Sequence, residues 1–214
     1  QKDITKTING RLSYHYPNEA QKNLKSKYSV SELNAAHFFD ASIRTPSFLE
    51  AAHTFNSAEI GSIMHIVMEH IDVKRFHQHD YLTSYLEDLV RRELLLPGEA
   101  SIVELDKVAH FAAGDLGKRM AAASNLHREH PFNLLHNQEG VEVMVQGVID
   151  CWFEEDGKII LLDYKTGEGT FRIDDRYRAQ LCLYKEALEN IQEKPVDQMF
   201  LYLFSEGRAQ EITV

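Results

Sequence analysis

The chain has 214 residues, 43% of them hydrophobic and 26% charged, so it can bury roughly 70% of the surface of the unfolded chain and is neither fibrous nor disordered. Asp and Glu number 33 against 23 Lys and Arg, and the net charge of −10 argues against a chain that attracts nucleic acid by long-range charge alone. Its two cysteines cannot build a disulfide framework or a four-cysteine metal site, and no apolar run could span a membrane, so we expect a protein of the reducing cytoplasm without membrane contact.

The N-terminal quarter of the chain is mixed and polar. We expect residues 1–56 to form an irregular arm with one short helix, in which Ser31 is the N-cap and Glu32 lies in the first turn. Apolar residues then recur at helical spacing over residues 58–72, directly after Ser57, whose hydroxyl is a suitable N-cap acceptor. Because this helix is apolar on most of its surface, we expect it to be largely buried.

More helices are expected in the middle of the chain, and strands after it. The expected helices cover residues 81–95, 100–112 and 115–123, with a break at Pro97-Gly98. The expected strands cover residues 130–135, 141–153, 159–164, 199–204 and 211–214, with one helix over 175–190. This order predicts an α/β fold with a mixed β-sheet flanked by helices on both faces. We expect one domain over 1–214, with a helical part at 57–125 and an α/β core at 126–214.

A predicted hairpin brings two acidic residues together. Asp156-Gly157 lies between two apolar runs, and this dipeptide favours a two-residue turn because both central positions need a positive φ. The register of such a turn places Asp150 directly opposite Asp163. Lys165 lies two residues beyond Asp163 and therefore on the same face of the strand.

Two carboxylates facing each other between apolar strands destabilise the fold unless a positive charge compensates them. Asp oxygens are hard ligands that suit Mg²⁺ or Mn²⁺, so one or two divalent cations are expected between Asp150 and Asp163. The ammonium of Lys165 could then activate a water or neutralise charge on a phosphate. Two other interpretations stay open at this point, a solvated surface pair and a pair of carboxylates that share a proton without metal.

Three motifs resemble those of a known enzyme family. Asp150, followed by Asp163-Tyr164-Lys165, resembles the D…(D/E)xK core of the PD-(D/E)xK nuclease superfamily. The segments 61–65 (GSIMH) and 177–184 (YRAQLCLY) resemble the G-[S/T]-x-x-H helix and the YxxQxxxY helix of its RecB-like branch. Further segments are similar to the C-terminal nuclease domain of the AddA family, the helicase–nuclease subunits of bacterial AddAB enzymes: 27–33, 128–132 and 147–150.

This resemblance implies a restriction-endonuclease-like core and a metal centre. It implies that His65, Asp150, Asp163 and the backbone carbonyl of Tyr164 bind the divalent metal, with Lys165 as the catalytic amine. Imidazole nitrogen binds Mn²⁺ and tolerates Mg²⁺, in agreement with the two ions expected above. A histidine on an apolar helix is otherwise more often a core residue than a ligand.

Other side chains are expected around this centre. Gln180 and Tyr184 are four residues apart and share one helix face with Tyr177. The resemblance implies that Gln180 and Tyr184 orient the lysine or contact a DNA phosphate, whereas a stripe that packs on the sheet is the alternative for Tyr184. Glu129 is a candidate supporting carboxylate, and Thr166 a candidate hydrogen-bond donor to phosphate.

The resemblance implies a DNA nuclease domain, an exonuclease or endonuclease, within a larger helicase–nuclease of the bacterial cytoplasm. Its substrate would be single-stranded DNA delivered by the helicase portion of the same protein during double-strand-break repair, and its partner would be of the AddB type. The chain has no phosphate-binding loop of the P-loop type, so the ATP motor is expected elsewhere.

Two rival functions are kept. One is a catalytically idle domain of the same fold that serves as a docking surface for a partner protein. The other is a metal phosphohydrolase that acts on a small substrate. A zinc site is disfavoured because the paired histidines lack accompanying cysteines and the usual spacing.

Overall fold

A computed structural model describes residues 27–30, 32, 55–138, 140–167 and 175–213. Most of the expected N-terminal arm, including Ser31, lies outside these ranges. Where the arm is described it is not irregular: β1 (Lys27–Ser29) pairs in parallel with a strand of the main sheet. Ser29 accepts the Glu32 N–H through its hydroxyl, and the Glu32 carboxylate accepts the Ser29 N–H. The expectation of an irregular arm is therefore wrong for this segment.

The first long helix, α3 (Ser57–His70), starts with a capping box. Its N-cap is Asn56 rather than the expected Ser57, because the Asn56 side chain accepts the N–H groups of Ala58 and Glu59 while Glu59 accepts the Asn56 N–H. The capping residue was therefore misplaced by one position. The helix turns its apolar side toward the sheet, as expected for a largely buried helix.

Four shorter helices follow: α4 (His79–Arg91), α5 (Pro97–Ser101), α6 (Leu105–Ala113) and α7 (Asp115–Ala122). The single helix expected over 100–112 is wrong, since two helices, α5 and α6, occupy this region. Pro97 begins α5 instead of separating two helices. A proline is well tolerated at the first helical position because its missing N–H would have no intrahelical partner there.

The sheet is mixed, as predicted, and contains six strands among the described residues. The main strands are β2 (Asn125–Gln138), β3 (Val141–Glu155), β4 (Lys158–Lys165), β5 (Val196–Leu203) and β6 (Arg208–Glu211). Their order is β1-β3-β4-β5-β6, and β2 pairs with β3; the β1–β3 and β4–β5 pairs are parallel and the others antiparallel. The final strand ends at Glu211 and does not cover the expected 211–214.

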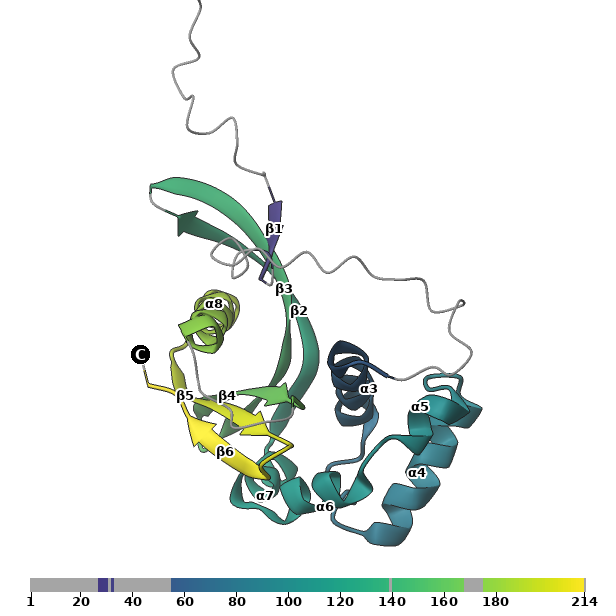
Figure 1. The fold of residues 1–214 in the computed structure, drawn as a ribbon. Helices are drawn as coiled ribbons and strands as arrows, with labels where there is room; N and C mark the ends of the chain where they lie inside the picture. The colour runs from purple at the N-terminus through teal and green to yellow at the C-terminus, as the bar shows by residue number, and fades with distance from the viewer. Residues whose placement is uncertain (1–26, 31, 33–54, 139, 168–174, 214) are drawn as a thin grey trace, which may run out of the picture.

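Helices cover both faces of this sheet. Figure 1 shows α3 on one side of the β2–β3 hairpin and α8 (Asp175–Gln192) on the other, with α4 to α7 extending from the α3 side. One hydrophobic core joins α3, α4, α6 and α7 to the sheet, and a second joins α8 to the opposite face. None of the described helices is long and apolar enough to cross a membrane.

The predicted hairpin turn between β3 and β4 is confirmed. Asp156 and Gly157 have φ values of 50° and 79°, and the pairing runs regularly from Glu155–Lys158 to Cys151–Leu162. The pairing stops there, so the expected direct opposition of Asp150 and Asp163 is wrong. The Asp150 carboxylate instead accepts the backbone N–H of Tyr164 at 2.8 Å.

A local break in the β2–β3 ladder explains this difference. Arg128 pairs with Cys151 and His130 pairs with Ile149, but Glu129 between them has a φ of 46° and no strand partner. Cys151 belongs to the core on the α3 side, while Ile149 belongs to the core on the α8 side, although residues two apart normally share a face. The strands therefore change face at this break, and the acidic side chains there turn toward α3.

Candidate active site

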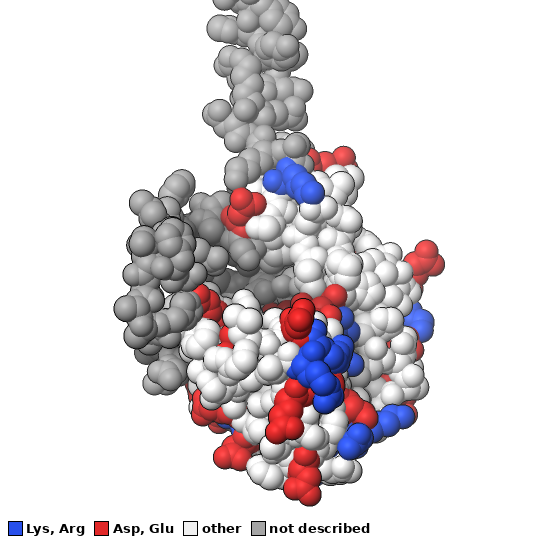
Figure 2. Space-filling model, turned by 90° about the vertical axis from the view of Figure 1, so that its right-hand side faces the viewer, with Lys and Arg blue, Asp and Glu red and all other residues white. Residues whose placement is uncertain are grey.

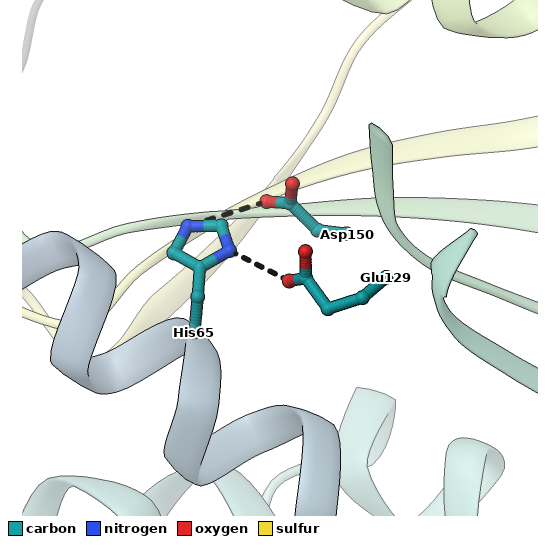
Figure 3. A group of neighbouring side chains, drawn as sticks. All are labelled: His65, Glu129 and Asp150. Atoms are coloured by element: carbon teal, nitrogen blue, oxygen red, sulfur yellow. Dashed lines mark hydrogen bonds and ion pairs between the residues drawn. The ribbon is translucent and has the colours of Figure 1, made fainter. Parts of the chain in front are cut away.

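His65 is held on α3 by two acidic residues of the sheet. Its Nδ1 lies 2.9 Å from Oε1 of Glu129, and its Nε2 lies 3.7 Å from Oδ2 of Asp150 (Figure 3). The carboxylate at Nδ1 requires a proton on that nitrogen, which leaves Nε2 directed at Asp150. Burial lowers the pKa of His65, but the Glu129 hydrogen bond and the nearby negative charges outweigh it, so the pKa is raised above its ordinary value.

These three residues form a group suited to a metal ion. One ligand atom each from His65, Glu129 and Asp150 lies within 4.8 Å of the others. Two of them, His65 and Asp150, were expected as ligands from the sequence. Glu129 was expected only as a supporting carboxylate, and its position in the group comes from the ladder break. Asp163 lies outside this group.

Asp150 is buried at the end of the regular β3–β4 pairing, with 6% of its surface exposed. Burial, and secondly the charge of Asp163, raise the pKa of Asp150 to about 8, although His65, Lys165 and the Tyr164 N–H favour the charged form. The described side chains therefore compensate the ionised form of Asp150 only in part. A divalent cation would remove this penalty.

Asp163 and Lys165 form an ion pair beside this group. Lys165 Nζ lies 2.7 Å from Oδ2 of Asp163, a side chain that is only 1% exposed. Burial lowers the pKa of Lys165, but the charges of Asp163 and Asp150 outweigh it and raise the pKa, so the amine is an ammonium. Despite this short distance, Oδ2 of Asp163 receives no hydrogen bond of normal geometry from the described part of the chain.

Gln180 and Tyr184 reach the same ion pair from α8. The Gln180 side-chain amide donates to Oδ1 of Asp163 at 3.2 Å and to the Tyr184 hydroxyl at 2.7 Å. Tyr184 is buried and packs edge-on against Phe132 at 5.8 Å, so its side chain fills the core as well as binding Gln180. The structure thus brings together the side chains that the sequence predicted for the site, with Asp163 directed at Lys165 and Gln180.

Comparison with known proteins identifies the family. The sequence profile described as the PD-(D/E)XK nuclease superfamily matches residues 34–213. The chain belongs to the PD-(D/E)XK nuclease superfamily. Its mixed sheet with helices on both faces is the fold expected for this family.

The relatives of this nuclease-family domain are much longer proteins. A protein from Alkaliphilus metalliredigens (strain QYMF), named as a subunit of an ATP-dependent helicase/nuclease, is 34% identical over 220 residues, which cover 92% of this chain and 18% of that protein. The protein of the same name from Thermoanaerobacter sp. (strain X514) is 36% identical over 236 residues, covering 98% of this chain and 19% of that protein. The chain thus spans about a fifth of the length of these relatives.

A solved structure shows a distant likeness. The structure titled "Crystal structure of SSO0001" aligns over 98% of this chain and 73% of its own, with 14% identity and a TM-score of 0.38. This likeness is too low to add to the family assignment.

The residues of this PD-(D/E)XK domain fit the divalent metal that the family uses. Imidazole nitrogen and carboxylate oxygen are ligands of Mn²⁺, and carboxylates also suit Mg²⁺. The raised pKa of Asp150 indicates that its charged form lacks full compensation from the described side chains, and a divalent cation would stabilise that form. The hydrogen bond from His65 to Glu129 is the type of contact that orients a histidine ligand.

Two remaining predictions concern the end of β4. Tyr164 is buried among Phe111 and Phe204, and its N–H holds Asp150; the role of its carbonyl as a metal ligand stays a prediction. Thr166 lies next to Gly61 of α3, with its Oγ1 3.5 Å from the position that a Cβ at Gly61 would occupy. Its role toward phosphate also stays a prediction.

Proposed function

We propose that this domain is a divalent-metal-dependent nuclease that hydrolyses phosphodiester bonds of single-stranded DNA. The observation that carries the proposal is the meeting of His65, Asp150 and the Asp163–Lys165 ion pair at one end of β4, in a chain of a nuclease family. A bound Mg²⁺ or Mn²⁺ supplies positive charge to the phosphate oxygens and lowers the pKa of a water.

The chain's own residues have distinct roles in this proposal. His65 and Asp150 hold the ion, and the remaining ligands come from Glu129, Asp163 or the Tyr164 carbonyl. The Lys165 ammonium donates to a phosphate oxygen and stabilises the charge that develops when the nucleophile attacks. Asp163 fixes the position of this ammonium.

Gln180 and Tyr184 support the ammonium from α8. Gln180 donates to Asp163, which restricts the carboxylate to the orientation that holds Lys165. Tyr184 accepts from Gln180 and is buried, so orientation of Gln180 fits its position better than contact with DNA. The cation–π contact between Lys165 Nζ and the Tyr177 ring, at 5.4 Å from the centroid, also restricts the ammonium.

We propose single-stranded rather than duplex DNA as the substrate because of the names of the relatives and the distribution of charge on the surface of this domain. The relatives are named for a helicase as well as a nuclease, and a helicase portion would supply single strands. On the face shown in Figure 2, the described Lys and Arg side chains occur in small groups beside Asp and Glu, without a continuous basic patch. Delivery by a helicase portion, and by an AddB-type partner, removes the need for strong electrostatic attraction by this domain.

An exposed face of β2 and β3 leads from the proposed metal centre to the tip of the β2–β3 hairpin. Val148 and Met144 lie two and six residues before Asp150, so they share its face of β3, and Leu135 of β2 pairs with Met144. These three apolar side chains are 41%, 37% and 56% exposed. Apolar side chains can contact unpaired bases without the repulsion that acidic residues would cause. We propose this face as the path of the substrate strand.

The experiment that tests the function uses the 214-residue chain with end-labelled single-stranded DNA, duplex DNA and nucleotides, in Mn²⁺, Mg²⁺ or EDTA. Metal-dependent cleavage of single strands that disappears in Lys165→Met is expected. Absence of DNA cleavage both by the folded, Mn²⁺-bound chain and by a complex that includes the helicase portion would favour the docking domain. Hydrolysis of nucleotides without cleavage of strands would favour the small-substrate phosphohydrolase.

A further inference from the structure

Arg128 caps the C-terminal end of α3 although it belongs to β2. Its Nη1 donates to the carbonyl of Met68 at 3.1 Å and to that of Ile71 at 2.5 Å. The last carbonyls of a helix have no intrahelical partners and carry a partial negative charge, so a guanidinium stabilises them. Arg128 is partly buried, which strengthens such a charged contact.

The next residue, Glu129, holds the same helix at a second point through His65. Adjacent residues of a regular strand point to opposite faces, so only one of the two could normally reach α3. The left-handed conformation of Glu129, with a φ of 46°, allows both to do so. Such a conformation costs about 1 to 2 kcal/mol for a residue with a Cβ, which makes it uncommon outside functional or strained sites.

We propose that Arg128 is a positioning residue of the metal centre. By holding the last turn of α3 on β2, it sets the position of His65 along the helix axis relative to Asp150 on the neighbouring strand β3. The two contacts, Arg128 on the carbonyls and Glu129 on the imidazole, form a clamp that prevents α3 from sliding or rotating. The inference deepens the proposed function and rests on it, because it concerns how the proposed metal ligands are kept in place.

The test measures metal binding without DNA. Mn²⁺ alone is titrated into metal-free Arg128→Met by calorimetry, and thermal unfolding is followed in parallel. Methionine retains the apolar stem of the side chain but not its donors, and we expect Mn²⁺ binding to weaken about tenfold, as for other residues that orient metal ligands. Arg128→Lys should recover most of the affinity, because an ammonium can donate to the same carbonyls.

The matched control is Arg119→Met. Arg119 of α7 is also partly buried and hydrogen-bonded, to Glu155 and Gln198, but it contacts the sheet near the β3–β4 turn. The Arg119→Met substitution should lower the melting temperature and leave the Mn²⁺ affinity unchanged. As a second readout, the ¹⁵N resonances of His65 in the metal-free protein should shift in Arg128→Met and not in the control.

A folded Arg128→Met protein with wild-type Mn²⁺ affinity and unshifted His65 resonances would overturn the proposal, since Arg128 would then only stabilise the fold. If Arg128→Met does not fold, Arg128→Gln is judged by the same criteria. The failure of the nuclease proposal would look different: the wild-type chain would bind Mn²⁺ without cleaving DNA, and the Arg128 variants would still differ in Mn²⁺ affinity.

Discussion

Replacement of Asp150 by Asn should stabilise the metal-free protein while abolishing its metal centre. The Asn side chain keeps the shape and the carbonyl oxygen that accepts the Tyr164 N–H, and it removes only the buried charge. In the folded state, burial and Asp163 raise the pKa of Asp150 from 3.8 to about 8. The folded protein therefore binds more protons at this residue than the unfolded chain does between these two pH values.

The sign and size of the effect follow from this difference. Because the unfolded chain releases the proton first, the contribution of Asp150 to the wild-type free energy of unfolding falls as pH rises from about 4 to 8 and is constant above that range. At about 1.4 kcal/mol per pKa unit, the buried charge of Asp150 lowers the free energy of unfolding by at most roughly 6 kcal/mol. Because the site can relax around the charge, we expect the free energy of unfolding of Asp150→Asn to exceed that of the wild type by roughly 2 to 4 kcal/mol at pH 8. Near pH 4 the two proteins should be equally stable.

The assay is urea unfolding in EDTA at pH 4.5, 6, 7 and 8.5, repeated with Mn²⁺. Mn²⁺ at a hundredfold excess over its Kd should stabilise the wild type by about 2.7 kcal/mol and leave Asp150→Asn unchanged. The control is Asp156→Asn, the same substitution at an exposed turn position where Asn is equally suitable. Equal stability of wild type and Asp150→Asn at pH 8.5, or a difference that does not change with pH, would refute the reasoning.

Three further predictions concern catalysis, backbone strain and substrate binding. Lys165→Met should reduce cleavage at least about a hundredfold without weakening Mn²⁺ binding, measured by single-turnover rates and calorimetry. Glu129→Gly should be about 1 kcal/mol more stable than Glu129→Ala in urea unfolding, because glycine adopts the positive φ without strain, while both variants lose Mn²⁺ affinity equally. Val148→Glu should raise the KM for single-stranded DNA about threefold or more at low salt, whereas Ile191→Glu on α8, at a similarly exposed position, should not.

Each of these predictions can fail on its own. Weaker Mn²⁺ binding in Lys165→Met would mean that the lysine maintains the metal centre instead of acting on the phosphate. Equal stabilities of the two Glu129 variants would contradict the strain at that residue. An unchanged KM in Val148→Glu would exclude this face of β3 as the path of the strand.

The sequence was sufficient where structure depends on close neighbours in the chain. The turn at Asp156-Gly157 forms as predicted because its two positive φ values depend on the turn residues themselves. The candidates His65, Asp163 and Lys165 came from the resemblance of short segments, each within a single element, to family motifs, and their catalytic roles stay predictions. The start of α3 was correct within one residue for the same reason, with Asn56 instead of Ser57 as the cap, whereas the start expected at residue 100 was wrong.

Only the tertiary structure decided how the site is assembled. The register of the hairpin turn predicted that Asp150 faces Asp163, but the break at Glu129 turns Asp150 to His65 on α3. The sequence carried no local signal for this break, because a glutamate with positive φ is held by its contact with His65, which is 64 residues away. Contacts between distant segments depend on how helices and strands pack, and packing is decided by the whole chain at once.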